Sequence, residues 1–316
     1  MSPCLQILLG LPGLALLCYG AEFLVRGGVR LSTALNIPKV VVGLTLVAFA
    51  TSAPELVVSI DSALKGVGDI SIGNVVGSNI CNIGLILGTA ALLTPMSVDA
   101  SLLRFDMPLL LAATALLCIV CAATHGIRRM DAVLFLAGFA WYLWKNVQTA
   151  LARKQGEAES PEEKAPPIGI PMALCLVAGG IAALAGGAKL FVDGAIALAR
   201  LCRVSDAVIG LTVVAIGTSL PELATSTVAA FRGEKEIAVG NVVGSNIFNI
   251  LAILGIAPLI APMQAAGIQT ADLGIMLGIT ILMYAMMLTG KVIRRAEGLA
   301  LLLCHLAYGA WLFLHG

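Results

Sequence analysis

The chain has 316 residues, of which 59% are hydrophobic and only 12% are charged. These charged groups are too few to cover the surface of a soluble globule. The composition therefore excludes a soluble protein and predicts one that lies in a lipid bilayer. The formal net charge of +1 gives no indication of nucleic-acid binding, and we expect no nucleic-acid partner.

Apolar stretches long enough to cross about 30 Å of hydrocarbon follow one another along the chain. The first five are expected near residues 4–25, 38–64, 70–93, 103–124 and 130–149. Five more are expected near residues 170–200, 205–231, 237–261, 270–290 and 295–314. The sequence therefore predicts an all-α, polytopic membrane protein with about ten transmembrane helices.

A charged segment that contains prolines separates the two sets of apolar stretches. Between Ala150 and Pro167 the chain holds seven charged residues and three prolines, which is the composition of a solvated linker. We therefore divide the chain into a first five-helix repeat at 1–149, a linker at 150–168 and a second five-helix repeat at 169–316.

Lys and Arg residues are distributed unevenly between the two sides of the membrane. Counting them on alternate connections gives thirteen on the side of the linker and five on the other. Because basic residues near short loops stay in the cytoplasm, we expect a cytoplasmic linker and both termini outside, in the plasma (inner) membrane. With an odd number of spans in each half, the second half enters the membrane upside down, so the repeats are inverted.

Polar motifs recur in the two halves. The segment from Gly73 to Ile83, GNVVGSNICNI, returns at Gly240 to Ile250 with a single substitution. The segment from Gly43 to Ser59 returns in similar form at 210–226, at the same offset of 167 residues (240 − 73). Two halves that share polar motifs in a membrane protein are typical of a transporter.

Each half places a glutamate directly after a proline in the middle of an apolar stretch, Glu55 in the first and Glu222 in the second. A carboxylate at such a depth is normally tolerated only where it faces the interior of the bundle and a partner, here a cation. Pro54 and Pro221 donate no backbone hydrogen bond, so they free carbonyl groups in the preceding turn. Carboxylate and carbonyl oxygens together suit a hard cation.

Further oxygen donors accompany these glutamates. On a helix, the hydroxyl residues three and four positions before each glutamate share its face, namely Thr51, Ser52, Thr218 and Ser219. The companion stretches carry polar residues at four-residue steps, namely Asn74, Ser78, Asn82, Asn241, Ser245 and Asn249. A helix kink or glycine packing would explain one such motif. Neither requires a buried glutamate, hydroxyls and asparagines in both halves, so we favour ion binding.

Two other classes of function are weighed against ion exchange. An enzyme is not expected, because no span pairs a serine with a base and no metal-hydrolase spacing of histidines occurs in the sequence. A passive cation channel stays open as an alternative. Asp106 and Asp272, near the starts of two spans, are ambiguous as residues of an ion pathway.

The two repeated segments resemble the alpha repeats of the cation/calcium exchanger superfamily, and they are most similar to the sodium/calcium exchanger branch and its short prokaryotic members. The similarity covers both halves of the chain. It implies ten helices in two inverted halves, with discontinuous helices packed around one central site.

The resemblance also implies roles for individual residues. Two glutamates and two main-chain oxygens match the central calcium ligands, in the residues Glu55, Glu222, Thr51 and Thr218. Four hydroxyls and two main-chain carbonyls match sodium-site positions, in the residues Ser52, Ser78, Ser219, Ser245, Ala48 and Ala215. Asn82 and Asn249 flank the centre. Some relatives, including potassium-dependent ones, carry aspartate at the second of these positions, so its absence argues against a potassium requirement.

We therefore expect a secondary antiporter that exchanges Na⁺ for Ca²⁺ by alternating access and needs no cofactor. If three sodium ions exchange for one calcium ion, as the family suggests, transport is electrogenic. Neutral hydroxyl and amide oxygens favour sodium as the counter-ion, but proton/calcium exchange stays open because Glu55 and Glu222 could themselves take up protons. The first span of each half is expected to slide against the core as a gate. The sequence does not predict an oligomeric state.

Overall fold

The computed structural model describes residues 3–156, 169–202, 215–265 and 268–315. The helices of the first half are α1 (Pro3–Leu35), α2 (Lys39–Val42), α3 (Ala48–Thr51), α4 (Ala53–Leu64), α5 (Gly68–Cys81), α6 (Gly88–Leu93), α7 (Met107–Thr124) and α8 (Arg129–Gly156). Those of the second half are α9 (Ile170–Leu201), α11 (Ala215–Thr218), α12 (Leu220–Phe231), α13 (Lys235–Ile247), α14 (Leu254–Ile260), α15 (Thr270–Leu288) and α16 (Arg295–His315). Within the described residues, π-helical turns connect several of them, namely η1 (Gly43–Val47), η2 (Asn82–Leu87), η3 (Leu102–Asp106) and η5 (Phe248–Ile253).

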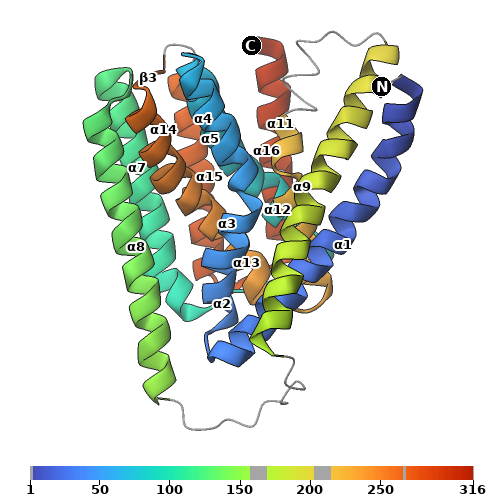
Figure 1. The fold of residues 1–316 in the computed structure, drawn as a ribbon. Helices are drawn as coiled ribbons and strands as arrows, with labels where there is room; N and C mark the ends of the chain where they lie inside the picture. Colours follow the sequence, from blue (N-terminus) through green and yellow to red (C-terminus); the bar gives the residue numbers. More distant parts are fainter. Residues whose placement is uncertain (1–2, 157–168, 203–214, 266–267, 316) are drawn as a thin grey trace.

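The prediction of an all-α, polytopic membrane fold is confirmed (Figure 1). Six helical stretches of the described chain are long and apolar enough to cross a bilayer, and a bent pair that runs from α2 to α4 makes up to seven. The number of ten spans stays a prediction, and residues 205–214 of the expected seventh span lie outside the described residues. Residues 157–168 of the expected linker also lie outside them, whereas α8 continues to Gly156, past its expected end at 149.

α1 and α9 form an antiparallel pair along one side of the molecule (Figure 1). A Cβ atom on Gly20 would lie 2.8 Å from the backbone nitrogen of Leu184, and one on Gly187 would lie 2.8 Å from that of Leu17. Only glycine permits such an approach, so the two backbones are in direct contact. Of the most apolar parts of α1 and α9, only 33% and 28% of the residues are buried, so the pair lies at the periphery.

The centre of the molecule is formed by α5–η2–α6 and by α13–η5–α14. In their apolar parts, 78% and 83% of the residues are buried. The glycines of α13 bring backbones together, because a Cβ atom on Gly240 would lie 2.8 Å from the carbonyl oxygen of Val40. For the matching motif of α5, the segment equivalent to α2 and η1 is 206–214, which lies outside the described residues.

Two short antiparallel ladders join the halves to each other. β1 (Met96–Ser97) pairs with β4 (Val292–Ile293), and β2 (Gly126–Ile127) pairs with β3 (Met263–Gln264). Because η3 and α7 lie between β1 and β2 in the chain, the two ladders sit at opposite ends of the bundle. Each ladder therefore ties a connection of one half to a connection of the other.

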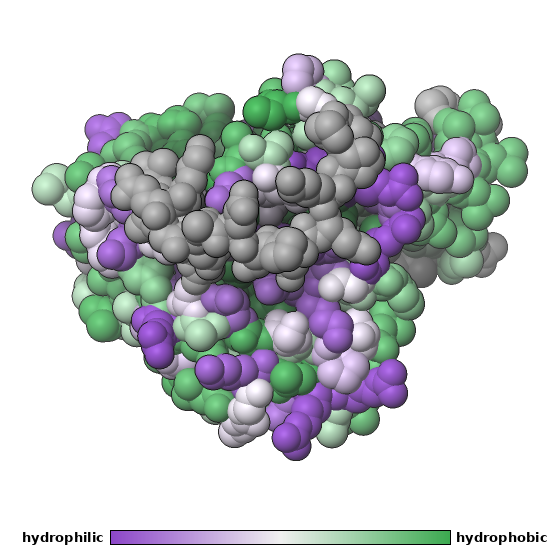
Figure 2. Space-filling view, turned by 90° about the horizontal axis from the view of Figure 1, so that it is seen from below, coloured by the Kyte–Doolittle hydropathy of each residue, from purple (hydrophilic) through white to green (hydrophobic). Residues whose placement is uncertain are grey.

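The two ends of the molecule differ in what they present. Both termini lie at the upper end in Figure 1, whereas α8 ends and α9 begins at the lower end. Figure 2 shows the lower face, on which hydrophilic residues gather over much of the middle and hydrophobic residues are prominent around the edge. A hydrophilic face with an apolar rim fits a bundle whose sides contact lipid and whose end contacts water.

Candidate cation-binding site

The first glutamate lies directly after a break in a helix. α3 ends at Thr51, Ser52 leaves helical geometry with φ −84° and ψ 6°, and α4 begins at the next residue. The chain bends by 46° at this point. Pro54 fits here, because a residue in the first turn of a helix needs no backbone donor. Glu55 therefore lies at the start of α4, where the helix dipole favours negative charge.

The second half repeats this break. α11 ends at Thr218, Ser219 has φ −90° and ψ 6°, and Pro221 lies in the first turn of α12. Glu222 occupies the same place in α12 that Glu55 occupies in α4. At each break the proline leaves the carbonyl four residues earlier without its helical partner. At its break, each half thus supplies one carboxylate and a carbonyl oxygen that lacks its helical hydrogen bond.

The two carboxylates converge from opposite halves. Ser52 Oγ donates a hydrogen bond of 2.7 Å to Glu222 Oε1, and Ser219 Oγ donates one of 3.2 Å to Glu55 Oε1. Glu55 is 1% exposed and Glu222 is 0% exposed. Because each serine lies three residues before the glutamate of its own half, these two bonds bring Glu55 and Glu222 to the same place. Two buried carboxylates brought together in this way require a cation or protons between them.

Several buried oxygen atoms around the glutamates have no hydrogen-bond partner within the described part of the chain. They are Glu55 Oε2, Glu222 Oε2, Asn82 Oδ1, Asn249 Oδ1 and Ser245 Oγ. Leaving one buried polar group unpaired costs about 1–3 kcal/mol, and more when the group is charged. A set of carboxylate, amide and hydroxyl oxygens that would each be costly to leave unpaired is suited to a hard cation.

The asparagines of the site are held by two asparagines that the sequence analysis did not single out. Asn82 Nδ2 donates to Asn246 Oδ1 at 3.0 Å, and Asn249 Nδ2 donates to Asn79 Oδ1 at 3.1 Å. All four side chains are at most 1% exposed. A signal was present, because Asn79 and Asn246 recur within the repeated motif, each three residues before a site asparagine.

The remaining predicted residues lie in the broken helices and in α5. Thr51 Oγ1 lies within hydrogen-bond distance of the carbonyl oxygens of Val47 and Ala48, at 3.1 and 3.3 Å, and of Asn241 Oδ1 in the other half, at 3.1 Å. This hydroxyl is therefore engaged, and the carbonyl of Thr51 is the candidate ligand. Ser78 is buried in α5. Ala215 and Thr218 are the first and last residues of α11.

The outer members of the two predicted polar stripes have another role. Asn74 Nδ2 donates to Ser59 Oγ at 3.1 Å, and Asn241 Nδ2 donates to Ser226 Oγ at 2.9 Å. These bonds connect α5 to α4 and α13 to α12. The two asparagines therefore brace the broken helices.

The two ambiguous aspartates take part in contacts outside this site. Asp272 accepts hydrogen bonds from the backbone of Gln269 at 3.1 Å and from Tyr308 Oη at 3.0 Å, so it caps α15. Asp106 is 3% exposed, and its Oδ1 has no hydrogen-bond partner within the described residues. These contacts involve none of the residues predicted for the site.

A hollow of about 490 Å³ lies between α9 and the two broken helices. Pro54, Pro221 and Thr218 line it on the side of the site, and α9 lines it from Ile181 to Asp193. Its walls are mostly apolar, with Lys189 as a further charged residue. The hollow therefore runs from the level of the glutamates along α9 toward the end of the molecule that carries the termini.

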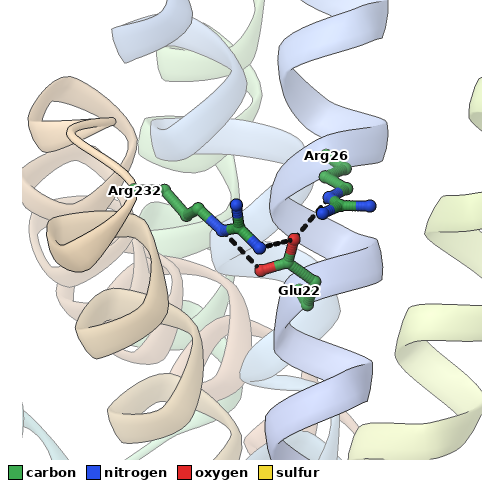
Figure 3. Close-up of polar contacts among 3 residues, drawn as sticks. All are labelled: Glu22, Arg26 and Arg232. Carbon is green, nitrogen blue, oxygen red and sulfur yellow. Dashed lines mark hydrogen bonds and ion pairs between the residues drawn. The ribbon is translucent and has the colours of Figure 1, made fainter.

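The equivalent place on α1 is bridged by ion pairs. Arg232, directly after α12, reaches Glu22 of α1 with Nε 2.9 Å from Oε2 and with a second nitrogen on Oε1 (Figure 3). Arg26 of α1 contacts the same carboxylate (Figure 3). Lys39 at the start of α2 pairs with Glu234 at 2.9 Å. α1 and α2 are thus bound to the turn between α12 and α13.

The sequence pattern of one protein family, described as "Sodium/calcium exchanger protein", matches residues 5–147 and again residues 172–314. The chain belongs to the sodium/calcium exchanger family. The two matches are offset by the same interval that separates the repeated motifs and the two helix breaks. Members of this family are transporters and not enzymes, which agrees with the sequence analysis.

Individual relatives cover nearly the whole exchanger chain. The sodium/calcium exchanger MaX1 of Methanosarcina acetivorans is 33% identical over 344 aligned positions, covering 98% of both chains. CaxA of Alkalimonas amylolytica is 39% identical and covers 96% of this chain and 97% of its own. A solved structure of the sodium-calcium exchanger NCX_Mj superposes with a TM-score of 0.86 and 34% identity, covering 98% of this chain and 99% of that one. The resemblance to this family and the all-α, polytopic membrane fold are confirmed, whereas the number of ten helices stays a prediction.

Proposed function

We propose that this exchanger is an antiporter that moves Ca²⁺ against Na⁺ across the plasma (inner) membrane. The observation that carries the proposal is the set of buried, unpaired oxygens around Glu55 and Glu222. Two carboxylates balance the charge of one calcium ion, and neutral oxygens complete its coordination. The proposed ligands beyond the two glutamates are Thr51, Thr218, Ser52, Ser219, Ser78, Ser245, Asn82, Asn249, Ala48 and Ala215.

The neutral ligands support sodium as the counter-ion. Sodium accepts hydroxyl, amide and carbonyl oxygens, whereas a proton-driven site needs titratable groups. Asn82, Asn249 and Ser245 present oxygens that do not titrate near neutral pH, yet they surround the carboxylates. We propose three sodium ions per calcium ion, so that one net charge crosses per cycle.

Alternating access gives these ions their route. The hollow beside α9 supports access from the end with the termini, and the ion pairs of Glu22 support closure of the other end. We assign the termini to the outside and the linker at 150–168 to the cytoplasm, because the basic residues gather on the linker side. The repeats at 1–149 and 169–316 are then the two halves whose relative movement opens the ion site to each side of the membrane in turn.

The test is isotopic calcium uptake into proteoliposomes that contain the purified protein. Uptake is expected when sodium is loaded inside, and an inside-positive potential should accelerate it, since a net positive charge leaves the vesicle. One charge corresponds to about 2.3 kcal/mol per 100 mV. Vesicles without protein and vesicles with equal sodium on both sides serve as controls.

Each other outcome contradicts a defined part of the proposal. Uptake driven by a pH gradient in sodium-free buffer would make the protein a proton/calcium antiporter. Calcium movement that continues with no counter-ion on the far side would make it a channel. Sodium-driven uptake that ignores the membrane potential would leave exchange in place but refute the electrogenic stoichiometry.

A further inference from the structure

The asparagines at the cation site are paired across the repeats and not within them. Asn82 of the first half donates to Asn246 of the second, and Asn249 of the second half donates to Asn79 of the first. Both bonds use the amide nitrogen of the site residue. In both site residues the amide oxygen is therefore the atom without a partner in the part of the chain that the structure describes.

This direction matters because an amide side chain presents two opposite poles. Rotation of the terminal amide by half a turn exchanges a carbonyl acceptor for an NH₂ donor. Beside Glu55 and Glu222, an unrestrained amide would turn its NH₂ group toward the carboxylates. Such an arrangement would bring a donor, which cannot coordinate a cation, to the place of a ligand oxygen.

We propose that Asn79 and Asn246 are positioning residues that keep the carbonyl oxygens of Asn249 and Asn82 turned toward the transported cation. The inference rests on the proposed function, because it takes the two glutamates to form the cation site. Each positioning residue lies on one central helix and acts on the other, α5 on η5 and α13 on η2. The orientation of each ligand amide is therefore set by the opposite repeat.

Asn79 is itself held in the required direction. Its Nδ2 lies 3.5 Å from the backbone oxygen of Asn246 and 3.9 Å from Met276 Sδ. With the nitrogen directed there, Asn79 Oδ1 faces Asn249. Asn246 Nδ2 has no partner within the described residues, so its amide is oriented on one side only, by the bond from Asn82.

The experiment is a double-mutant cycle read out as calcium binding to the purified protein, with sodium as competitor. Asn79→Leu removes the acceptor while it keeps the number and branching of the side-chain heavy atoms, and it should weaken calcium and sodium binding about 5- to 10-fold, the effect of one hydrogen bond of about 1 kcal/mol. In an Asn249→Ala background the same change should have almost no effect, because Asn79 acts through Asn249. Asn246→Leu and Asn82→Ala form the second cycle.

A crossed pair supplies the matched control. Asn79→Leu combined with Asn82→Ala should be additive, because the structure pairs Asn79 with Asn249. Asn79→Asp keeps an acceptor oxygen for Asn249 and should not weaken cation binding. If Asn79→Leu does not fold, Asn79→Ala completes the same cycle.

Two results would overturn the inference. The first is full additivity of Asn79 with Asn249, which would indicate a packing role alone. The second is equal weakening of binding by the Leu and Asp variants. Because the readout is equilibrium binding, either result can occur while the parent still exchanges sodium for calcium, so the failure of this inference is distinguishable from failure of the proposed function.

Discussion

The centre of this exchanger follows its internal repeat, whereas the charged residues of α1 and α9 follow it only in part. At the centre, the two bonds from serine to glutamate are counterparts of each other 167 residues apart, and so are the two bonds between asparagine side chains. On the peripheral pair, Glu22 binds Arg232 of another helix. The equivalent residue of α9, Lys189, pairs 3.6 Å away with Asp193 of its own helix.

The difference teaches how a symmetric site can be open to one side. Glu22 of α1 is the repeat equivalent of Lys189, which lines the hollow beside α9, and Arg232 engages Glu22 from the turn after α12. Lys65, the repeat equivalent of Arg232, pairs instead with Asp61 of its own helix.

The strongest test of the symmetric centre is removal of either carboxylate. Glu55→Gln and Glu222→Gln should each reduce sodium-driven calcium flux by more than about 100-fold, because breaking one partner of a buried charged set costs about 3–5 kcal/mol. Equal losses are expected, since both residues are buried and occupy equivalent places. Asp61→Asn, on an exposed surface of α4, is the control and should transport normally.

The same two variants can also show that the site assignment is wrong. Sodium-driven flux that survives in Glu55→Gln or Glu222→Gln at the parent rate would show that the carboxylate in question does not hold the cation. A large difference between the two would refute the equivalence of the halves.

The contact between α1 and α9 should also behave symmetrically. Gly20→Ala and Gly187→Ala each force a Cβ atom against a backbone nitrogen 2.8 Å away, so each should destabilise the protein by about 1–3 kcal/mol. Gly186→Ala, whose Cβ atom meets nothing within 4 Å among the described residues, should be nearly neutral. Unfolding in detergent measures the difference. A destabilised Gly186→Ala with an unaffected Gly187→Ala would contradict the packing.

The serines that reach across the centre provide a finer comparison. Ser52→Ala and Ser219→Ala each remove a hydrogen bond to the opposite glutamate, and a bond to a charged group contributes about 1.5–3 kcal/mol. Calcium affinity is expected to change by at least about 10-fold in both variants, measured by equilibrium binding. Ser62→Ala, at a buried position of α4, serves as the comparison and should leave affinity unchanged.

The smallest effect is expected at the asymmetric ends. Glu22→Gln removes a partly exposed ion pair of about 1 kcal/mol, so it should shift the balance between the two access states by about fivefold. Val25, buried in α1, and Val192, which lines the hollow, are equivalent positions. In the Glu22→Gln background, thiol labelling of Val25→Cys should rise and that of Val192→Cys should fall.

Lys189→Gln is the matched control for this prediction. Its partner lies on the same helix, so removal of its charge breaks no contact between α9 and the core. Labelling at both cysteines should stay as in the parent. Identical labelling in Glu22→Gln and the parent would show that the ion pair does not hold α1 against the core.

Repetition made much of the site predictable. Glu55, Glu222, Ser52 and Ser219 could be chosen from the sequence because a costly polar residue that appears twice has few structural explanations. The structure brings these four together.

The rest depended on contacts between distant parts of the chain. Helical periodicity placed Asn74 with the ligands, but its amide bonds Ser59 instead. Asn79 lies off that stripe, and its role is visible only once the opposite half supplies Asn249. The ladder from Met96 to Ile293 is similarly non-local, and strands of two residues carry no alternation that a sequence could reveal.

The two ladders have a mechanical consequence. Because β1–β4 and β2–β3 fasten one half to the other at both ends of the bundle, the connections flanking α7 and α15 cannot separate without breaking backbone hydrogen bonds. The two ladders thus hold the halves together at both ends of the bundle. α1 and α9 contain none of these strands, so both helices can move in a rocking motion that leaves the two ladders intact.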